Sequence, residues 1–239
     1  MKKQKICIIG GGLTGLITAL CLSKLNIEVD LLYDDIKINK KFSGTVAISQ
    51  NNLDFLKKFN LYKFLKKDFW PCTIIKLYSK NNKKDSEEIF QLDNNKLGKK
   101  VFYVIENWKL VDLMLKEIRK SKLISLKKQK KIGSLSFLKN LKFNNKIPSK
   151  YNLIILCTGN NSNLVKKIFN NKVYKHEYAE TSIITMIKHQ KTKNNIARQI
   201  FLDDEILALL PISNTTTSIV LSTQKELTKK YKKKNYLFN

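Results

Sequence analysis

The sequence predicts an α/β fold, in which a Rossmann-like domain with a parallel sheet is interleaved with an incomplete antiparallel β-sheet domain. Three observations support this prediction. The chain opens with an apolar run, a glycine-rich turn and an apolar helical segment. A late apolar run, at 151–157, leads into another glycine, and we expect its residues 153–157 to join residues 6–9 and 27–32 in one parallel sheet. Short apolar segments separated by polar turns lie between and after these runs, a pattern typical of antiparallel strands.

The N-terminal unit has the pattern of a dinucleotide site. Residues 6–9 read as a buried parallel strand, residues 16–25 as a helix and residues 27–32 as a second strand. The turn between them matches G-x-G-x-x-G. In this motif the first glycine permits the tight turn, the second lets a pyrophosphate approach the backbone, and the third lets helix and strand pack closely. The helix N-terminus then attracts the phosphates. The predicted cofactor-binding residues of this turn are Gly10, Gly12, Leu13, Thr14 and Gly15.

A carboxylate that binds the ribose is expected at the end of the second strand, about 20 residues beyond the glycines. Tyr33 occupies the usual position and Asp34 follows it, so Asp34 is the candidate for the ribose hydroxyls. The alternative is that Asp34 and Asp35 only open a polar loop. No basic residue replaces the acid, so this pocket does not favour a 2′-phosphate.

The net charge of +27 comes almost entirely from lysine, because only Arg119 and Arg198 among the 46 basic residues are arginine. Excess lysine and asparagine with little arginine is typical of coding bias in an AT-rich genome. Proteins that read nucleic-acid sequence rely on arginine, so we expect no nucleic-acid partner. Weak peripheral contact with an anionic membrane needs only net charge.

Other segments exclude several classes of protein. The basic start followed by apolar residues imitates a signal peptide, but glycines interrupt its apolar part and no small-x-small cleavage site follows. No run of about 18 apolar residues predicts a membrane-spanning helix. The four cysteines are widely separated, which indicates buried free thiols in a reducing compartment, and the two histidines are too isolated for a metal site. We expect a cytoplasmic protein, with peripheral contact at the inner face of the membrane.

Further elements follow from periodicity along the chain. Helices are expected at 51–65 and 108–120, and a strand at 101–105. The segments 74–78 and 88–92 predict a hairpin, and 135–138 with 141–143 a smaller one. The remaining expected strands lie at 151–157, 178–188, 200–202, 206–212 and 217–222.

Four segments occur in an order and spacing that resemble a known family: Thr45-Val46-Ala47-Ile48-Ser49, Tyr103-Val104-Ile105-Glu106-Asn107, and the stretches at 197–202 and 207–212. Together with the glycine turn, they resemble the flavin-dependent hydroxylases of ubiquinone biosynthesis, within the para-hydroxybenzoate-hydroxylase-like FAD monooxygenases. The resemblance implies a discontinuous FAD-binding domain at 1–72 and 101–170. It also implies an incomplete substrate-type β-sheet domain at 73–100 and 171–239.

The resemblance further implies a function. Asn107 would face the flavin side of the cofactor, and Thr158 and Gly159 would lie beneath it. NAD(P)H would reduce the flavin, and oxygen would then be used to hydroxylate a small phenol or quinone precursor. The cofactor carries this chemistry, so no catalytic side chain and no metal is expected.

The chain also departs from the family's pattern. Thr158 stands where the family usually has Asp, Gly44 where it has Arg, and Tyr33 where it has Glu. The family's later Gly-Asp and Pro-x-x-Gly-x-Gly segment does not occur. We therefore expect a C-terminally truncated, impaired hydroxylase, with a partner chain as one source of the missing part. The alternatives are a non-catalytic FAD-binding remnant and an NAD-dependent oxidoreductase.

Overall fold

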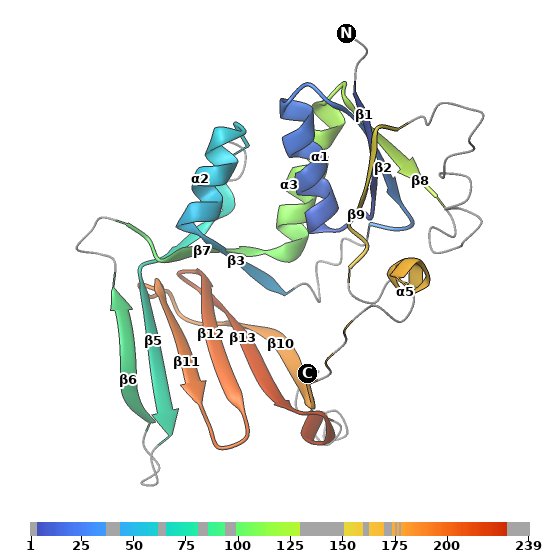
Figure 1. The fold of residues 1–239 in the computed structure, drawn as a ribbon. Helices are drawn as coiled ribbons and strands as arrows, with labels where there is room; N and C mark the ends of the chain where they lie inside the picture. Colours follow the sequence, from blue (N-terminus) through green and yellow to red (C-terminus); the bar gives the residue numbers. More distant parts are fainter. Residues whose placement is uncertain are drawn as a thin grey trace. The chain divides into compact units, whose positions relative to one another are not determined.

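The computed structural model describes residues 4–36, 44–61, 66–80, 86–93, 99–129, 151–159, 163–169, 174, 176 and 178–228. The chain divides into two compact units (Figure 1). Unit 1 comprises Met1–Asn39 and Trp108–Lys175, and unit 2 comprises Lys40–Asn107 and His176–Asn239. The domain boundaries that the resemblance implies stay a prediction.

Unit 1 contains a four-stranded sheet in the order β8-β2-β1-β9, with every neighbouring pair parallel. Its strands are β1 (Lys5–Ile9), β2 (Glu28–Tyr33), β8 (Ile124–Lys128) and β9 (Leu153–Leu156). Its helices are α1 (Leu13–Lys24), α5 (Asn163–Phe169) and α3 (Asn107–Lys120), whose first residue belongs to unit 2. The sequence-based prediction that residues 6–9, 27–32 and 153–157 share one parallel sheet is therefore confirmed.

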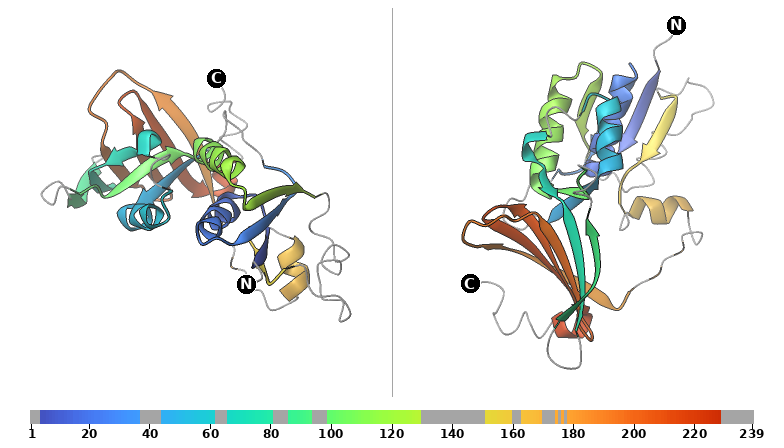
Figure 2. Two further views of the ribbon diagram at one scale, coloured as in Figure 1. Left: turned by 90° about the horizontal axis from the view of Figure 1, so that it is seen from above. Right: turned by 90° about the vertical axis from the view of Figure 1, so that its left-hand side faces the viewer.

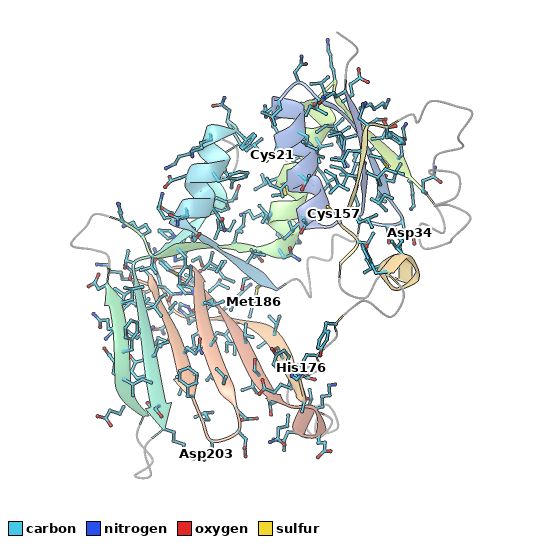
Figure 3. All side chains as sticks on the ribbon, in the orientation of Figure 1. Cys21, Asp34, Cys157, His176, Met186 and Asp203 are labelled. Carbon is cyan, nitrogen blue, oxygen red and sulfur yellow. The ribbon has the colours of Figure 1, made fainter. Side chains whose placement is uncertain are left out.

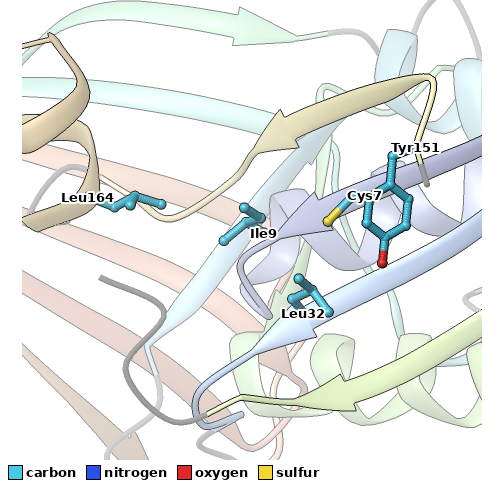
Figure 4. Packing of buried hydrophobic residues seen from close by; sticks show 5 residues of the cluster. All are labelled: Cys7, Ile9, Leu32, Tyr151 and Leu164. Atoms are coloured by element: carbon cyan, nitrogen blue, oxygen red, sulfur yellow. The ribbon is translucent and has the colours of Figure 1, made fainter. Parts of the chain in front are cut away.

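The central strands β1 and β2 are buried on both faces, which explains why most of their residues are apolar, with Asp30 as the buried exception. Helices α1 and α3 lie on one face and α5 on the other (Figure 2). Side chains alternate between these faces along each strand. On the α5 face, Cys7, Ile9 and Leu32 pack with Tyr151 and with Leu164 of α5 (Figure 4). Both sides of the sheet thus contribute to the core.

Unit 2 contains two further sheets. The larger has the order β10-β13-β12-β11-β5-β6, in which only the β11–β5 pair is parallel. The smaller is antiparallel and has the order β3-β7-β4. The elements are β3 (Thr45–Ser49), α2 (Gln50–Lys58), a 3-10 turn η1 (Lys66–Asp68), β4 (Trp70–Cys72), β5 (Ile74–Lys80), β6 (Ser86–Asp93), β7 (Phe102–Glu106), β10 (Glu180–Lys188), β11 (Ile196–Phe201), β12 (Ile206–Ser213) and β13 (Thr216–Gln224).

The two sheets of unit 2 pack through a small core of Cys72, Val104 and Ala197, which partly buried hydrophobic residues surround. The predicted hairpin of 74–78 and 88–92 is confirmed as the antiparallel pair β5–β6. The predicted strands at 178–188, 206–212 and 217–222 correspond to β10, β12 and β13. The predicted smaller hairpin at 135–143 lies outside the described residues.

One helix prediction was too long. Helix α2 ends at Lys58, whereas the sequence pattern extended it to residue 65. Asn60 adopts a left-handed φ of 55°, and the Leu61 N–H donates to the Leu56 carbonyl at 2.9 Å. This backbone reversal caps the helix, and Leu61 is fully buried beyond it. Leu61 therefore continued the apolar pattern without continuing the helix.

Strand β6 forms one edge of the larger sheet, and all eight of its residues are exposed. Ile89 and Phe90 near its middle are 56% and 51% exposed. The β5–β6 register shifts between Leu77 and Tyr78, which marks a bulge. This edge is thus apolar at its centre and irregular in its pairing.

In the part of the chain that the structure describes, no helix combines the length and the apolarity required to cross a membrane.

Candidate cofactor-binding site

The glycine turn lies at the carboxyl edge of the parallel sheet of unit 1. The Gly10 N–H donates to the Leu32 carbonyl at 2.8 Å, and the Cys157 N–H donates to the Ile9 carbonyl at 2.7 Å. These bonds continue the β1–β2 and β1–β9 ladders past the ends of the strands. The segments that follow β1, β2 and β9 therefore meet at one edge, which is where open α/β sheets bind ligands.

Two glycines of the turn are required by the fold itself. Gly10 has a φ of 124°, and a Cβ there would lie 2.6 Å from the carbonyl carbon of Cys157. A Cβ on Gly15 would collide with the carbonyl oxygen of Gly10. Helix α1 can begin this close to β1 and β9 only because both positions lack a side chain.

Gly12 is different, because neither its backbone angles nor the described residues around it require a glycine there. Its φ of −77° and ψ of 177° are extended values that any residue adopts. A Cβ at Gly12 would meet no atom of the described residues within 4 Å. The open space lies at the N-cap of α1, where the first turn carries no acidic residue. The first N–H groups of a helix have no intrahelical partner, so the turn fits an incoming anion such as a pyrophosphate.

Tyr33 and Asp34 lie beside the turn, at the end of β2. Gly11 is packed against this segment, because a Cβ there would lie 2.8 Å from the Tyr33 Cβ and 2.7 Å from a side-chain carbon of Ile36. Tyr33 is partly buried, whereas Asp34 is exposed (Figure 3). Asp34 is thus accessible to a ligand at the edge where the sequence analysis expected the ribose to bind.

Thr158 and Gly159 follow β9 at the same edge. The Thr158 side-chain oxygen Oγ1 is buried and has no hydrogen-bond partner among the described residues. Gly159 has a φ of 74°, a left-handed value that favours glycine. A buried polar atom without a partner is costly, and a polar group of a ligand would satisfy it.

Asn107 belongs to unit 2, where it is the first residue of α3. Its N–H donates to the Gly44 carbonyl at 2.8 Å. Its side-chain oxygen Oδ1 is buried and, like Thr158 Oγ1, has no partner in the described part of the chain. The remaining predicted residues, Gly10, Gly12, Leu13, Thr14, Gly15, Tyr33, Asp34, Thr158 and Gly159, are gathered at one edge of unit 1. Their contact with a cofactor stays a prediction.

Two residues next to the turn were missed by sequence reasoning. The Thr18 hydroxyl donates to the Thr14 carbonyl at 2.7 Å, and Thr18 also contacts Cys157. Burial raises the pKa of the Cys157 thiol, and the contact with Thr18 only partly offsets this rise. Cys157 is therefore a neutral packing residue that joins α1 to the end of β9. Only the four-residue spacing between Thr14 and Thr18 pointed to this arrangement.

A buried charge cluster on β2 was also missed. Asp30 is 2% exposed and accepts hydrogen bonds from Lys127 Nζ and from the Tyr151 hydroxyl, both at 2.7 Å. Lys5 Nζ lies 3.6 Å from the same carboxylate. Burial alone would raise the pKa of Asp30, but the bonds from Lys127 and Tyr151, together with the charges of Lys127 and Lys5, lower it on balance. Burial and the bond to Asp30 both raise the pKa of Tyr151. The available signal was an acid, Asp30, placed between apolar residues of a strand.

Comparison with known proteins gives two curated relatives. The FAD-dependent monooxygenase nvfK of Aspergillus novofumigatus is 28% identical over 123 residues, which are 51% of this chain and 26% of nvfK. The mitochondrial ubiquinone biosynthesis monooxygenase COQ6 of Drosophila melanogaster is 24% identical over an aligned length of 244 residues, covering 94% of this chain and 50% of COQ6. The chain thus spans a quarter to a half of the length of these relatives. No family model matches it.

Solved structures with the same fold agree with these relatives. PqsL of Pseudomonas aeruginosa, a probable FAD-dependent monooxygenase, superposes with a TM-score of 0.72 at 11% identity, over 96% of this chain and 63% of PqsL. HpxO of Klebsiella pneumoniae, in a variant complexed with FAD, superposes with a TM-score of 0.67 at 13% identity, over 92% of this chain and 57% of HpxO. The homologues and structural neighbours of this chain are FAD-dependent monooxygenases, and the chain shares their fold.

Proposed function

We propose that the chain acts as a flavin-dependent monooxygenase, an oxidoreductase in which unit 1 binds the ADP part of FAD. The observation that carries the proposal is the open space at Gly12. Neither the backbone angles of Gly12 nor the described residues around it require a glycine at this position. Gly12 lies at a helix N-terminus, which suits a pyrophosphate. The similarity to nvfK and COQ6 supports FAD as the dinucleotide.

Each part of the predicted site would hold a different part of FAD. The first turn of α1 would donate backbone N–H groups to the pyrophosphate, and Asp34 would accept hydrogen bonds from the ribose hydroxyls. The buried oxygens of Thr158 and Asn107, which have no partner in the described structure, would gain one from polar groups of the cofactor. FAD, when bound, supplies the redox and oxygen chemistry. The protein's own part is to bind, orient and exclude water.

The substrate and the reductant belong to the same proposal. The name of COQ6 supports a ubiquinone precursor, a phenol or quinone, as the molecule hydroxylated. NAD(P)H is proposed as the reductant, as the family resemblance implies. Because the chain covers 50% of COQ6, these assignments concern the activity of the whole enzyme.

The predicted phosphate site is tested by Gly12→Val. The new side chain would fill the open space and block the approach of the pyrophosphate, while the fold has room for its Cβ. We expect FAD binding, measured by fluorescence titration, to be abolished and the thermal unfolding midpoint to change little. Leu25→Val is the matched control, since Leu25 is 59% exposed just beyond the other end of α1. Equal FAD affinity of wild type and Gly12→Val would refute the site.

A second experiment tests turnover by the 239-residue chain. Thr158 cannot supply the family's carboxylate, and Gly44 cannot supply its guanidinium. Each charged hydrogen bond lost could weaken cofactor binding by about 1.5–3 kcal/mol. We expect that the purified chain, given FAD, NADPH and a demethoxy quinone precursor, forms little hydroxylated product. Any NADPH oxidation should appear as hydrogen peroxide. Coupled turnover, with product matching NADPH consumed, would contradict this expectation.

We also propose a cytoplasmic location with peripheral membrane contact, supported by the net charge of +27. Co-sedimentation with anionic but not with neutral vesicles is the expected result, and salt should reverse it.

A further inference from the structure

Unit 2 contains a cavity of about 540 Å³ between the start of α2 and the segment that leads into β7. This volume lies within the range of small-molecule sites, about 300–1,000 Å³. The residues that line it are Ser49, Gln50, Asn51, Asp54, Lys99, Lys100, Val101 and Tyr103. None of them belongs to the predicted cofactor site, so the inference does not depend on the proposed function.

The lining is polar and carries positive charge. Two of the lining residues, Lys99 and Lys100, are lysines, and one, Asp54, is an acid. This carboxylate already has partners, because it accepts hydrogen bonds from Lys57 Nζ at 2.7 Å and from Gln50 Nε2 at 3.0 Å. The bond from Lys57 is the main cause that lowers the pKa of Asp54, and the nearby charge of Lys99 contributes. The single negative charge of Asp54 therefore does not neutralise the positive charges of both lysines.

Hydrogen-bond donors add to this charge. Gln50 and Asn51 are the first two residues of α2, so their backbone N–H groups have no intrahelical partner. Ser49 caps the helix by accepting from the Asn52 N–H at 3.3 Å, which leaves its own hydroxyl hydrogen to donate. A ligand here would meet two lysines and several donors, together with apolar surface to which Val101 and the Tyr103 ring contribute.

We propose that this cavity binds a small soluble molecule through a phosphate monoester group, held by Lys99, Lys100 and the first turn of α2. A phosphate monoester presents three acceptor oxygens and close to two negative charges, which matches two ammonium groups and a set of donors better than a carboxylate does. The remaining volume of the cavity would take the organic part of the molecule.

The test is a titration of the ¹⁵N-labelled chain with inorganic phosphate, followed through backbone amide shifts at constant ionic strength. We expect saturable shifts at residues 49–51 and 99–101. The double variant Lys99→Gln/Lys100→Gln should weaken binding by about tenfold or more. Lys116→Gln is the matched control, since Lys116 is an exposed lysine on α3 that pairs with Asp112. It should bind phosphate as the wild type does.

Three further arms make the test decisive. Gly12→Val should leave the shifts at 49–51 and 99–101 unchanged, which separates this cavity from the predicted cofactor site. Acetate should bind more weakly than phosphate. Equal phosphate affinity in the double variant and in Lys116→Gln would overturn the proposal. Shifts that appear only with phosphatidate-containing vesicles, and not with free phosphate, would also overturn it, because they would assign the surface to a lipid headgroup.

Discussion

At the scale of single residues, the three motif glycines serve two different purposes. Gly10 and Gly15 are required by backbone geometry and close packing, whereas Gly12 only leaves space. We expect Gly10→Ala and Gly15→Ala to lower the free energy of unfolding by about 2–3 kcal/mol. Gly12→Ala should change it by less than about 1 kcal/mol, because alanine fits the same extended backbone. Urea unfolding of the three variants measures this difference. A loss for Gly12→Ala as large as for Gly15→Ala would show that the turn needs Gly12 for folding.

The glycine spacing made this part of the site predictable from sequence, because the motif is local and every position has a mechanical reason. The burial and hydrogen bonding of the Thr158 and Asn107 side-chain oxygens could not be predicted from sequence. Whether a side-chain oxygen is buried without a partner depends on how distant segments pack around it. Their positions came from the family resemblance, and their buried, unpartnered oxygens came only from the structure.

At the scale of elements, the Asp30 cluster joins three segments of unit 1. Asp30 lies on β2, Lys127 on β8, and Tyr151 just before β9. Because the pKa of Asp30 is lowered in the folded state, its contribution to stability is present above the unfolded pKa of about 3.9. It is lost as the pH falls through the folded value. The raised pKa of Tyr151 affects stability at alkaline pH. Its contribution is present below about pH 10 and is lost as the pH rises through the folded value.

We therefore expect Asp30→Asn to lower the free energy of unfolding by about 2–3 kcal/mol near pH 7. The difference from wild type should shrink toward pH 3 and again above pH 10. Urea unfolding across this pH range measures it. Asp112→Asn is a matched control, since it breaks the i,i+4 pair with Lys116 and should cost only about 0.5 kcal/mol. A difference that stays constant from pH 3 to pH 11 would contradict the linkage.

The elements that sequence could predict are those with a strong apolar pattern of their own. Strands β1 and β9 are almost entirely apolar, β2 is mainly apolar, and helix α3 has a clear amphipathic pattern. Strand β8 was missed because Ile124–Lys128 ends in two lysines, and it is a strand only because it pairs with β2. Strand β4 has three residues, one of them Pro71, and depends on β7 in the same way. A strand that forms because it pairs with a segment distant in sequence has only a weak pattern in its own residues.

At the scale of the whole molecule, a net charge of +27 should oppose folding through self-repulsion. Screening weakens this repulsion, since the Debye length falls from about 30 Å at 0.01 M to about 8 Å at 0.15 M salt. We expect the thermal unfolding midpoint at pH 7 to rise when NaCl is increased from about 10 mM to about 150 mM. Chloride is chosen over phosphate so that binding in the unit 2 cavity does not contribute. A midpoint that falls or stays constant would show that local ion pairs outweigh the net charge.

Strand β6 has a consequence for how the chain behaves in concentrated solution. An edge strand with exposed Ile89 and Phe90 is a template on which another extended segment can add by backbone hydrogen bonds. Two features oppose this addition. The bulge disturbs the ladder, and three of the strand's eight residues, Glu87, Glu88 and Asp93, are acidic. Colloidal stability should therefore depend on this one strand more than its small share of the sequence suggests.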